Sequence, residues 1–143
     1  MNLSGSRYLL LPLGAWAVAQ ASKVVLVSIK ARRLDLRALA STGGMPSSHT
    51  AMAVALSTVM ARYLGLRSPV FALAVIFSMV VMYDAAGVRR SAGRQAAVLN
   101  RLVTDLVALR GIREENLREL IGHTPMEIFV GSAIGILIGL IPI

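Results

Sequence analysis

The chain contains no cysteine, so disulfide bonds and thiolate chemistry are excluded. Acidic residues are scarce: seven Asp and Glu stand against fifteen Lys and Arg, and only two histidines are present. No tight cluster of His, Asp and Glu occurs, so we expect neither a metal ion nor another cofactor. Hydrophobic residues make up 56% of the 143 residues, and the mean hydropathy is +0.70. This composition is too apolar for a water-soluble protein of that size.

Four apolar runs approach the roughly 20 residues that a membrane-spanning helix needs. They cover residues 8–27, 49–66, 69–88 and 125–141. The first lacks a clear small-x-small cleavage site, so we do not read it as a cleavable signal peptide. Residues 90–120 are more polar, and apolar side chains recur there at helical spacing, as expected of an amphipathic helix on the membrane or across the bundle. We predict one all-α, membrane-embedded domain over residues 1–143: a polytopic bundle of about four transmembrane helices plus an amphipathic cytoplasmic helix.

The basic residues are distributed unevenly over the segments that flank these four runs. Segments 23–45 and 89–122 share one side of a four-span chain and hold twelve Lys and Arg, against three on the other side. This asymmetry predicts that both long loops are cytoplasmic and both termini outside, in a multi-pass protein of the cell membrane. The lipid bilayer is the expected partner. Nucleic acid is not, because a multi-span chain needs these charges for its orientation.

The segment Gly-Gly-Met-Pro-Ser-Ser-His-Thr, residues 43–50, opens the second apolar run. Ser47 or Ser48 as N-cap, with glycines before it, explains the segment as a helix start. That explanation leaves His49 unassigned. Helix-end N–H groups favour an anion, and histidine is the side chain that titrates nearest to neutral pH. His49 therefore suits a proton donor beside a phosphate group.

The fourth apolar run begins with a similar pattern around the second histidine. Thr124 as N-cap, Pro125 at the first helical position and Glu127 three residues after the cap form a predicted capping box. The capping box gives Glu127 a structural role but leaves His123 unexplained. A structural and a catalytic interpretation of this pair therefore stand side by side.

Folding the four runs into one bundle brings the polar residues to one membrane face. Lys23 stands near the end of the first run, and His49 and His123 begin the second and fourth. Arg89 and Arg90 follow the third run, close after Asp84. Two histidines with several cations match the needs of phosphoryl transfer, which uses a nucleophile, a proton donor and fixed positive charge. Clustering of cations at the cytoplasmic interface would explain the arginines but not the histidines.

The chain resembles the divergent phosphatidic acid phosphatase type 2 family, within the superfamily of lipid phosphatases and vanadium haloperoxidases. The resemblance runs nearly end to end. It rests on Ala-Gln-Ala-Ser-Lys at 19–23, Gly-Gly-Met-Pro-Ser-Ser-His-Thr-Ala at 43–51, the segment 81–100, and Leu-Ile-Gly-His-Thr-Pro-Met-Glu-Ile-Phe-Val-Gly at 120–131.

The resemblance implies specific roles for the polar residues. His123 would be the nucleophile, Glu127 the residue that orients it, and His49 the acid. Lys23 would bind the substrate phosphate. We also expect Ser47, Ser48, Arg89 and Arg90 to contact it, with Arg94 as an alternative to the two arginines. The superfamily also has a Ser-Arg pair six residues before the nucleophile, where this chain has Leu117, with Arg118 one place later.

Three functions remain open at this point. The leading one is a membrane phosphatase that hydrolyses a lipid phosphate monoester through a phosphohistidine. The second is a non-catalytic protein that binds or moves phosphorylated lipids. The third, much weaker, is a metal-assisted phosphatidyltransferase built on Asp84, Gly87 and Arg90, which lacks the further aspartates that such a site wants.

Small residues recur every four positions in the last run, at Gly131, Gly135 and Gly139. Such a stripe allows helices to pack closely in a membrane. It could serve a homodimer or packing within one chain, and we favour packing within one chain.

Overall fold

The computed structural model describes residues 6–34, 44–110 and 123–142. Within these ranges the chain is helical and contains no strand. The helices are α1 (Arg7–Ala31), α2 (Ser48–Leu64), α3 (Pro69–Tyr83), the π-helical turn η3 (Asp84–Val88), α4 (Arg89–Arg110) and α5 (Pro125–Gly139). The prediction of an all-α membrane helix bundle is confirmed.

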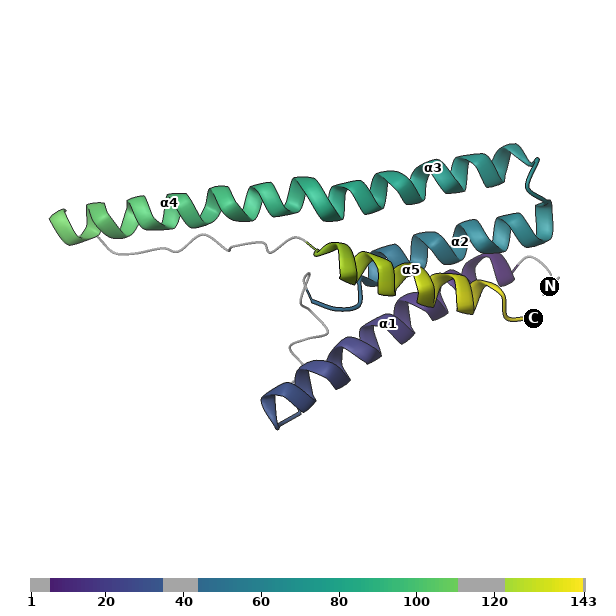
Figure 1. Ribbon diagram of the computed structural model, residues 1–143, viewed down its shortest axis with the longest axis horizontal. Coiled ribbons are helices and arrows are strands. Elements are labelled where there is room, and N and C mark those ends of the chain that lie inside the picture. Colours follow the sequence, from purple (N-terminus) through teal and green to yellow (C-terminus); the bar gives the residue numbers. More distant parts are fainter. Residues whose placement is uncertain (1–5, 35–43, 111–122, 143) are drawn as a thin grey trace.

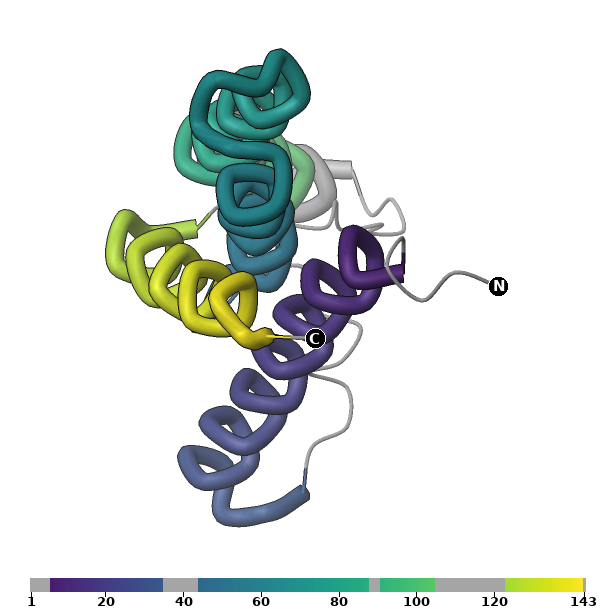
Figure 2. Tube along the Cα trace, turned by 90° about the vertical axis from the view of Figure 1, so that its right-hand side faces the viewer, coloured from purple at the N-terminus to yellow at the C-terminus, as the bar shows by residue number. Residues whose placement is uncertain are grey.

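Helix α2 occupies the centre of the bundle. It packs against α1, α3 and α5, and α1 also contacts α5. Figure 2 shows α2 flanked by these three helices, and Figure 1 shows α3 running back alongside α2 after a tight turn. The start of α1, the end of α2, the start of α3 and the end of α5 lie at one end of the bundle, while α5 begins at the other (Figure 1). The helices thus alternate in direction, as the four apolar runs predicted.

Small side chains form the interior of the bundle. Ala15 and Ala19 of α1 meet Ala51 and Ala55 of α2, with Ile134 and Ile138 of α5 packed against them. Large apolar side chains lie outside instead, including Leu9, Leu10, Leu13, Leu73, Phe77, Phe129 and Leu137. Water would penalise such a surface, whereas lipid tails accept it and small residues allow close helix approach.

The glycine stripe of α5 packs onto α2 of the same chain. A Cβ at Gly131 would lie 2.5 Å from the Ser47 carbonyl oxygen, and one at Gly135 would lie 2.5 Å from that of Ala51. At Gly139 it would lie 2.7 Å from the Thr58 Cβ atom. The stripe therefore serves packing between α5 and α2 of the same chain, and the homodimer stays untested. Only glycine lets these two backbones approach so closely.

Two of the expected spans are long and apolar enough to cross a membrane: α1 and the continuous helix Pro69–Thr104. Helices α2 and α5 have 17 and 15 residues and are shorter than a usual span of roughly 20 residues. The 36-residue helix Pro69–Thr104 is about 54 Å long, well beyond the roughly 30 Å hydrocarbon thickness.

The amphipathic helix forms α4, which continues from α3 through η3. It extends away from the bundle, so the predicted placement across the bundle is wrong (Figure 1). Its placement on the membrane stays a prediction. The π-helical turn keeps the helix axis continuous, because it adds one residue to a turn without breaking the helix. The expected short helix at 113–120 lies outside the described residues.

Candidate functional site

Helix α5 begins with the predicted capping box. The Thr124 hydroxyl accepts a hydrogen bond from the Glu127 backbone N–H at 3.4 Å, and the Glu127 Oε2 atom accepts one from the Thr124 backbone N–H at 3.1 Å. Pro125 occupies the first helical position. Two backbone donors that a helix start leaves without partners are thereby satisfied.

The same carboxylate oxygen also holds His123. The distance from His123 Nδ1 to Glu127 Oε2 is 2.8 Å, and the histidine is 2% exposed. The geometry is therefore compatible with both interpretations of Glu127, because the same oxygen accepts from the Thr124 N–H at the helix start and contacts the imidazole. With the proton on Nδ1 directed at the carboxylate, Nε2 carries the lone pair that a nucleophile needs.

A second contact fixes the backbone of His123. Its N–H donates to the Ala85 carbonyl oxygen at 2.9 Å, and Ala85 lies in η3. Single π-helical turns inside α-helices occur often at functional sites. The chain that enters α5 is thus bound to the point where α3 passes into α4.

Helix α2 begins beside α5, and Ser47 is its N-cap. The Ser47 Oγ atom accepts from the Thr50 N–H at 3.4 Å and lies 2.9 Å from the Thr50 hydroxyl oxygen. The Ser47 backbone N–H donates to the Glu127 carbonyl oxygen at 3.1 Å. Ser47 and Ser48 are both buried. Of the two N-cap candidates the structure selects Ser47, and its hydroxyl is engaged in the cap.

Lys23 lies inside α1 rather than at its end, because the apolar helix continues for about two turns to Ala31. Its side chain is 2% exposed and packs against Gly44, where a Cβ would lie 3.9 Å from the Lys23 Cδ atom. Gly44 has a φ of 91°, a conformation that glycine adopts without strain. The Lys23 ammonium interacts electrostatically with Glu127. Glu127 thus bonds to the buried imidazole of His123 and also acts electrostatically on the buried Lys23.

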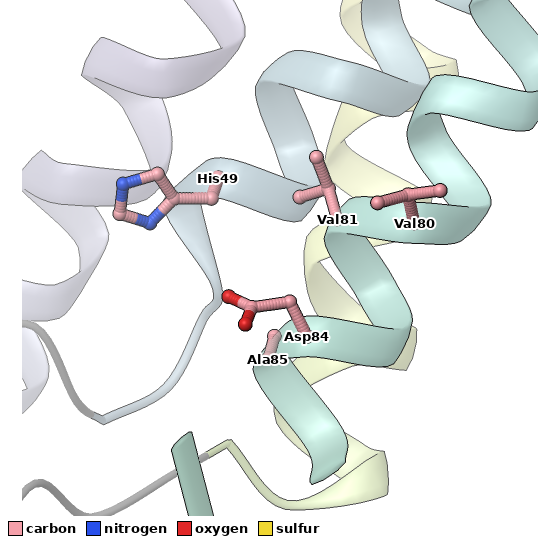
Figure 3. A pocket seen from close by; sticks show the side chains of 5 residues that line it. All are labelled: His49, Val80, Val81, Asp84 and Ala85. Carbon is pink, nitrogen blue, oxygen red and sulfur yellow. The ribbon is translucent and has the colours of Figure 1, made fainter. Parts of the chain in front are cut away.

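His49 lines a cavity of about 240 Å³ together with Val80, Val81, Asp84 and Ala85. Figure 3 shows the Asp84 carboxylate directed from η3 toward the start of α2, where His49 lies. Ala85 belongs to the cavity wall, and its carbonyl group binds the His123 backbone. The cavity beside the predicted acid therefore borders on the segment that carries the predicted nucleophile.

Only the backbone of the two predicted phosphate-binding arginines can be described. Arg89 and Arg90 begin α4 directly after η3, so their backbone lies within about one and a half helical turns of Ala85. The side chains of both arginines lie outside what the structure describes, as do Leu117 and Arg118. Among the described residues no group of three or more His, Cys, Asp or Glu side chains is arranged to hold a metal ion.

Sequence reasoning missed the residues that support the site through tertiary contacts. Ala85 and Gly44 carry no chemical group that could have singled them out, and Gly131 was predicted as a packing residue but not as a neighbour of Ser47. Asp84 offered a signal, because a carboxylate at the end of an apolar run is costly unless it has a function or a partner.

Comparisons with known proteins agree with this architecture. The sequence is 44% identical over 152 aligned residues to the uncharacterized membrane protein YuiD of Bacillus subtilis, covering 99% of this chain and 96% of that protein. No solved structure shows a significant match. The divergent PAP2 family, in which PAP2 stands for phosphatidic acid phosphatase type 2, matches residues 4–138. The chain therefore belongs to the divergent PAP2 family.

Proposed function

We propose that this protein is a membrane phosphatase that hydrolyses a lipid phosphate monoester through a phosphohistidine on His123. The observation that carries the proposal is the 2.8 Å contact between His123 Nδ1 and Glu127 Oε2 at a buried position. A carboxylate on one ring nitrogen orients the imidazole and stabilises the positive charge that develops when the other nitrogen attacks. Capping of α5 alone requires no histidine at this place.

The first chemical step transfers the phosphoryl group to the enzyme. The Nε2 lone pair of His123 attacks phosphorus, and the bond from phosphorus to the ester oxygen breaks. The departing alkoxide takes a proton from protonated His49 and leaves as the lipid alcohol. Glu127 offsets the positive charge of the phosphorylated imidazole.

The second step returns the enzyme to its starting state. Water attacks phosphorus, the bond from phosphorus to Nε2 breaks, and neutral His49 accepts the proton that the water loses. Inorganic phosphate leaves. His123 recovers its lone pair, and His49 is protonated again for the next turnover.

The remaining residues bind the phosphate oxygens. Lys23 supplies a positive charge beside Glu127, and the first turn of α2 directs backbone N–H groups toward an anion. Arg89 and Arg90 are the further phosphate ligands in this proposal. Ser48 is a further ligand, because it is the first residue of α2. The Ser47 hydroxyl is hydrogen-bonded to Thr50 instead, so Ser47 contributes by capping the helix.

The substrate is an anionic lipid that reaches the site from the cytoplasmic leaflet. Phosphatidate, phosphatidylglycerophosphate and a polyprenyl phosphate all carry a terminal phosphate on an apolar anchor. The basic residues at this end of the bundle attract such headgroups. The family relationship supports a lipid phosphate as the substrate class.

A non-catalytic binder of phosphorylated lipids is the second candidate. It is favoured by Leu117, which stands where the superfamily has the arginine of its Ser-Arg pair. Without that arginine the site would hold the anion less firmly during transfer. Binding of a lipid phosphate without release of inorganic phosphate is the behaviour this candidate predicts.

The test is phosphate release by the purified protein from a panel of these three lipids, with and without a chelator. We expect release by the wild type and by Thr124→Ala, which removes only the cap hydroxyl. His123→Ala should release none. If the wild type binds the lipids but releases no phosphate from any of them, the binder is correct and the phosphatase is not.

A further inference from the structure

The cavity beside His49 has two kinds of wall. Val80, Val81 and Ala85 form its apolar part, and His49 and Asp84 form its polar part. Its volume of about 240 Å³ is smaller than the roughly 300–1,000 Å³ of a pocket that encloses a whole small-molecule ligand. The cavity therefore accommodates one portion of a lipid substrate and not the whole molecule.

The cavity reaches the outer surface of the bundle along α3. Val80 is 60% exposed, and in a membrane-spanning helix such an apolar side chain faces lipid. Asp84 follows one turn later, where α3 passes into η3. A lipid whose chains lie against α3 can thus place the atoms near its headgroup in the cavity.

The proposed mechanism places the leaving alcohol in this cavity, and not the phosphate. Attacking and leaving atoms lie roughly in line in phosphoryl transfer. The attacking Nε2 atom belongs to His123, whereas the proton for the departing oxygen comes from His49, which lines the cavity. The alcohol that His49 protonates therefore lies beside the other polar residue of the cavity, Asp84.

The Asp84 carboxylate determines which alcohol fits there. Figure 3 shows it directed toward the start of α2, where His49 lies. An ionised carboxylate accepts hydrogen bonds and repels phosphate oxygens. It has about four acceptor positions, so Asp84 can accept from a ligand while it keeps its contacts within the protein. An alcohol with a further hydroxyl group supplies the donor, whereas a purely apolar alcohol does not.

We propose that Asp84 determines substrate specificity by accepting a hydrogen bond from a hydroxyl group on the leaving alcohol, next to the scissile ester. Val80 and Val81 contact the carbon atoms of that alcohol. This assignment rests on the proposed phosphatase function, and it narrows the substrate to lipids whose terminal phosphate is carried by a polyol. Of the three candidate lipids, phosphatidylglycerophosphate has such a hydroxyl group. The leaving alcohols of phosphatidate and of a polyprenyl phosphate have none.

The test compares two substrates that differ in one hydroxyl group. One is phosphatidylglycerophosphate, and the other is its deoxy analogue, in which propane-1,3-diol replaces the glycerol that carries the terminal phosphate. We expect the kcat/KM of the wild type to be about 10- to 100-fold higher for the hydroxyl-bearing substrate, as a hydrogen bond to a charged group contributes. Asp84→Ala should reduce this ratio to about one. Asp84→Asn keeps a neutral acceptor and should give an intermediate ratio, and it preserves the test if Asp84→Ala does not fold.

Asp105→Ala is the matched control. Asp105 belongs to α4, about 30 Å further along the same continuous helix, so its loss removes the same charge at a distance from the cavity. The ratio should keep its wild-type value in this variant. An equal fall of the ratio with Asp105→Ala would overturn the proposal, because overall charge and not the cavity would then set the preference.

Two further results would contradict a specificity role of Asp84. One is an equal kcat/KM of the wild type for the two substrates. The other is an equal loss of kcat/KM for both substrates in Asp84→Ala, because Asp84 would then act through His49 and not on the alcohol.

Lipid binding separates this proposal from the phosphatase reaction itself. If the wild type releases no phosphate from either substrate, the proposed reaction is wrong, and equilibrium binding of the same two lipids in detergent micelles decides the role of the cavity. Tighter binding of the hydroxyl-bearing lipid that is lost in Asp84→Ala would support recognition by Asp84. Equal binding of both lipids would overturn it.

Discussion

One carboxylate oxygen of Glu127 contacts both the Thr124 backbone N–H and the His123 ring. Substitutions can therefore test its capping role and its catalytic role separately. Glutamine at position 127 still offers an oxygen to the Thr124 N–H, so the cap of α5 should weaken by less than about 1 kcal/mol. The charge opposite His123 would disappear, however. We expect turnover of Glu127→Gln to fall roughly 10³- to 10⁴-fold, as when the carboxylate of a catalytic triad becomes an amide.

Thr124→Ala is the converse variant. It removes the hydroxyl that accepts from the Glu127 N–H and leaves the contact with His123 intact. We expect a stability loss of about 0.5–2 kcal/mol with turnover preserved. Steady-state kinetics and thermal unfolding of both variants provide the measurement. Parallel loss of activity and stability in the two variants would show that Glu127 acts only as a cap.

His49 is the second residue whose role can be separated from folding. As a general acid it should contribute about 10²- to 10⁴-fold to turnover, so His49→Ala should lose that factor while it keeps its helices. An aryl phosphate, whose leaving group needs no proton, should recover part of the loss. Equal damage with alkyl and aryl substrates would instead indicate a structural role beside Asp84.

At the scale of the helices, the packing of α5 on α2 depends on the absence of side chains. A Cβ at Gly135 would lie 2.5 Å from the Ala51 carbonyl oxygen and 2.9 Å from the Ala55 nitrogen, both backbone atoms of α2. We expect Gly135→Ala to destabilise the protein by about 1–3 kcal/mol, because the helices must separate. Thermal unfolding in detergent measures the effect.

Gly14 of α1 provides the control for this change. A Cβ there would meet only the Ile138 side chain, at 4.0 Å. Gly14→Ala should therefore be neutral, or stabilising by up to about 1 kcal/mol through its better helix propensity. A similar loss in both variants would mean that the glycine stripe does not act through close packing.

The starts of α2 and α5 could be predicted from the sequence because local chemistry decides them. Ser47 and Thr124 cap their helices with hydroxyl groups a few residues from their partners, so a short pattern suffices. The end of α1 at Ala31 was harder to predict. Residues 24–31 contain no proline or glycine that would end a helix, so the sequence does not show where α1 stops. The amphipathic pattern of α4 was visible, but not its direction, which depends on the π-helical turn.

In the candidate site, too, the features set by local sequence could be predicted, and those set by tertiary contacts could not. His49, His123, Glu127 and Lys23 could be selected by residue type and by their place at apolar run ends. The hydrogen bond from His123 to Ala85 and the approach of Gly131 to Ser47 could not, because each joins backbones that are far apart in sequence. Only the packed bundle determines which carbonyl group faces which amide.

At the scale of the whole molecule, the bundle has two different ends. One holds both histidines, Lys23 and most of the Lys and Arg residues in the described part of the chain, and the other holds the start of α1 and the end of α2. The charge asymmetry predicts that the histidine end faces the cytoplasm. Because the chain has no cysteine, single cysteines can report this directly. Those at Arg33 and Arg110 should be labelled only from the cytoplasm, and those at Asn2 and Ile143 only from outside. Labelling of positions 33 and 110 from opposite sides would contradict the alternating arrangement.

The most direct test of the central claim is to trap the phosphorylated enzyme. The protein is mixed with a lipid phosphate labelled with ³²P, quenched at alkaline pH within milliseconds, and digested to find the labelled residue. We expect an alkali-stable, acid-labile label on His123, present in the wild type and absent from His123→Ala. Phosphate release without a label on His123, or near-normal release by His123→Ala, would contradict it.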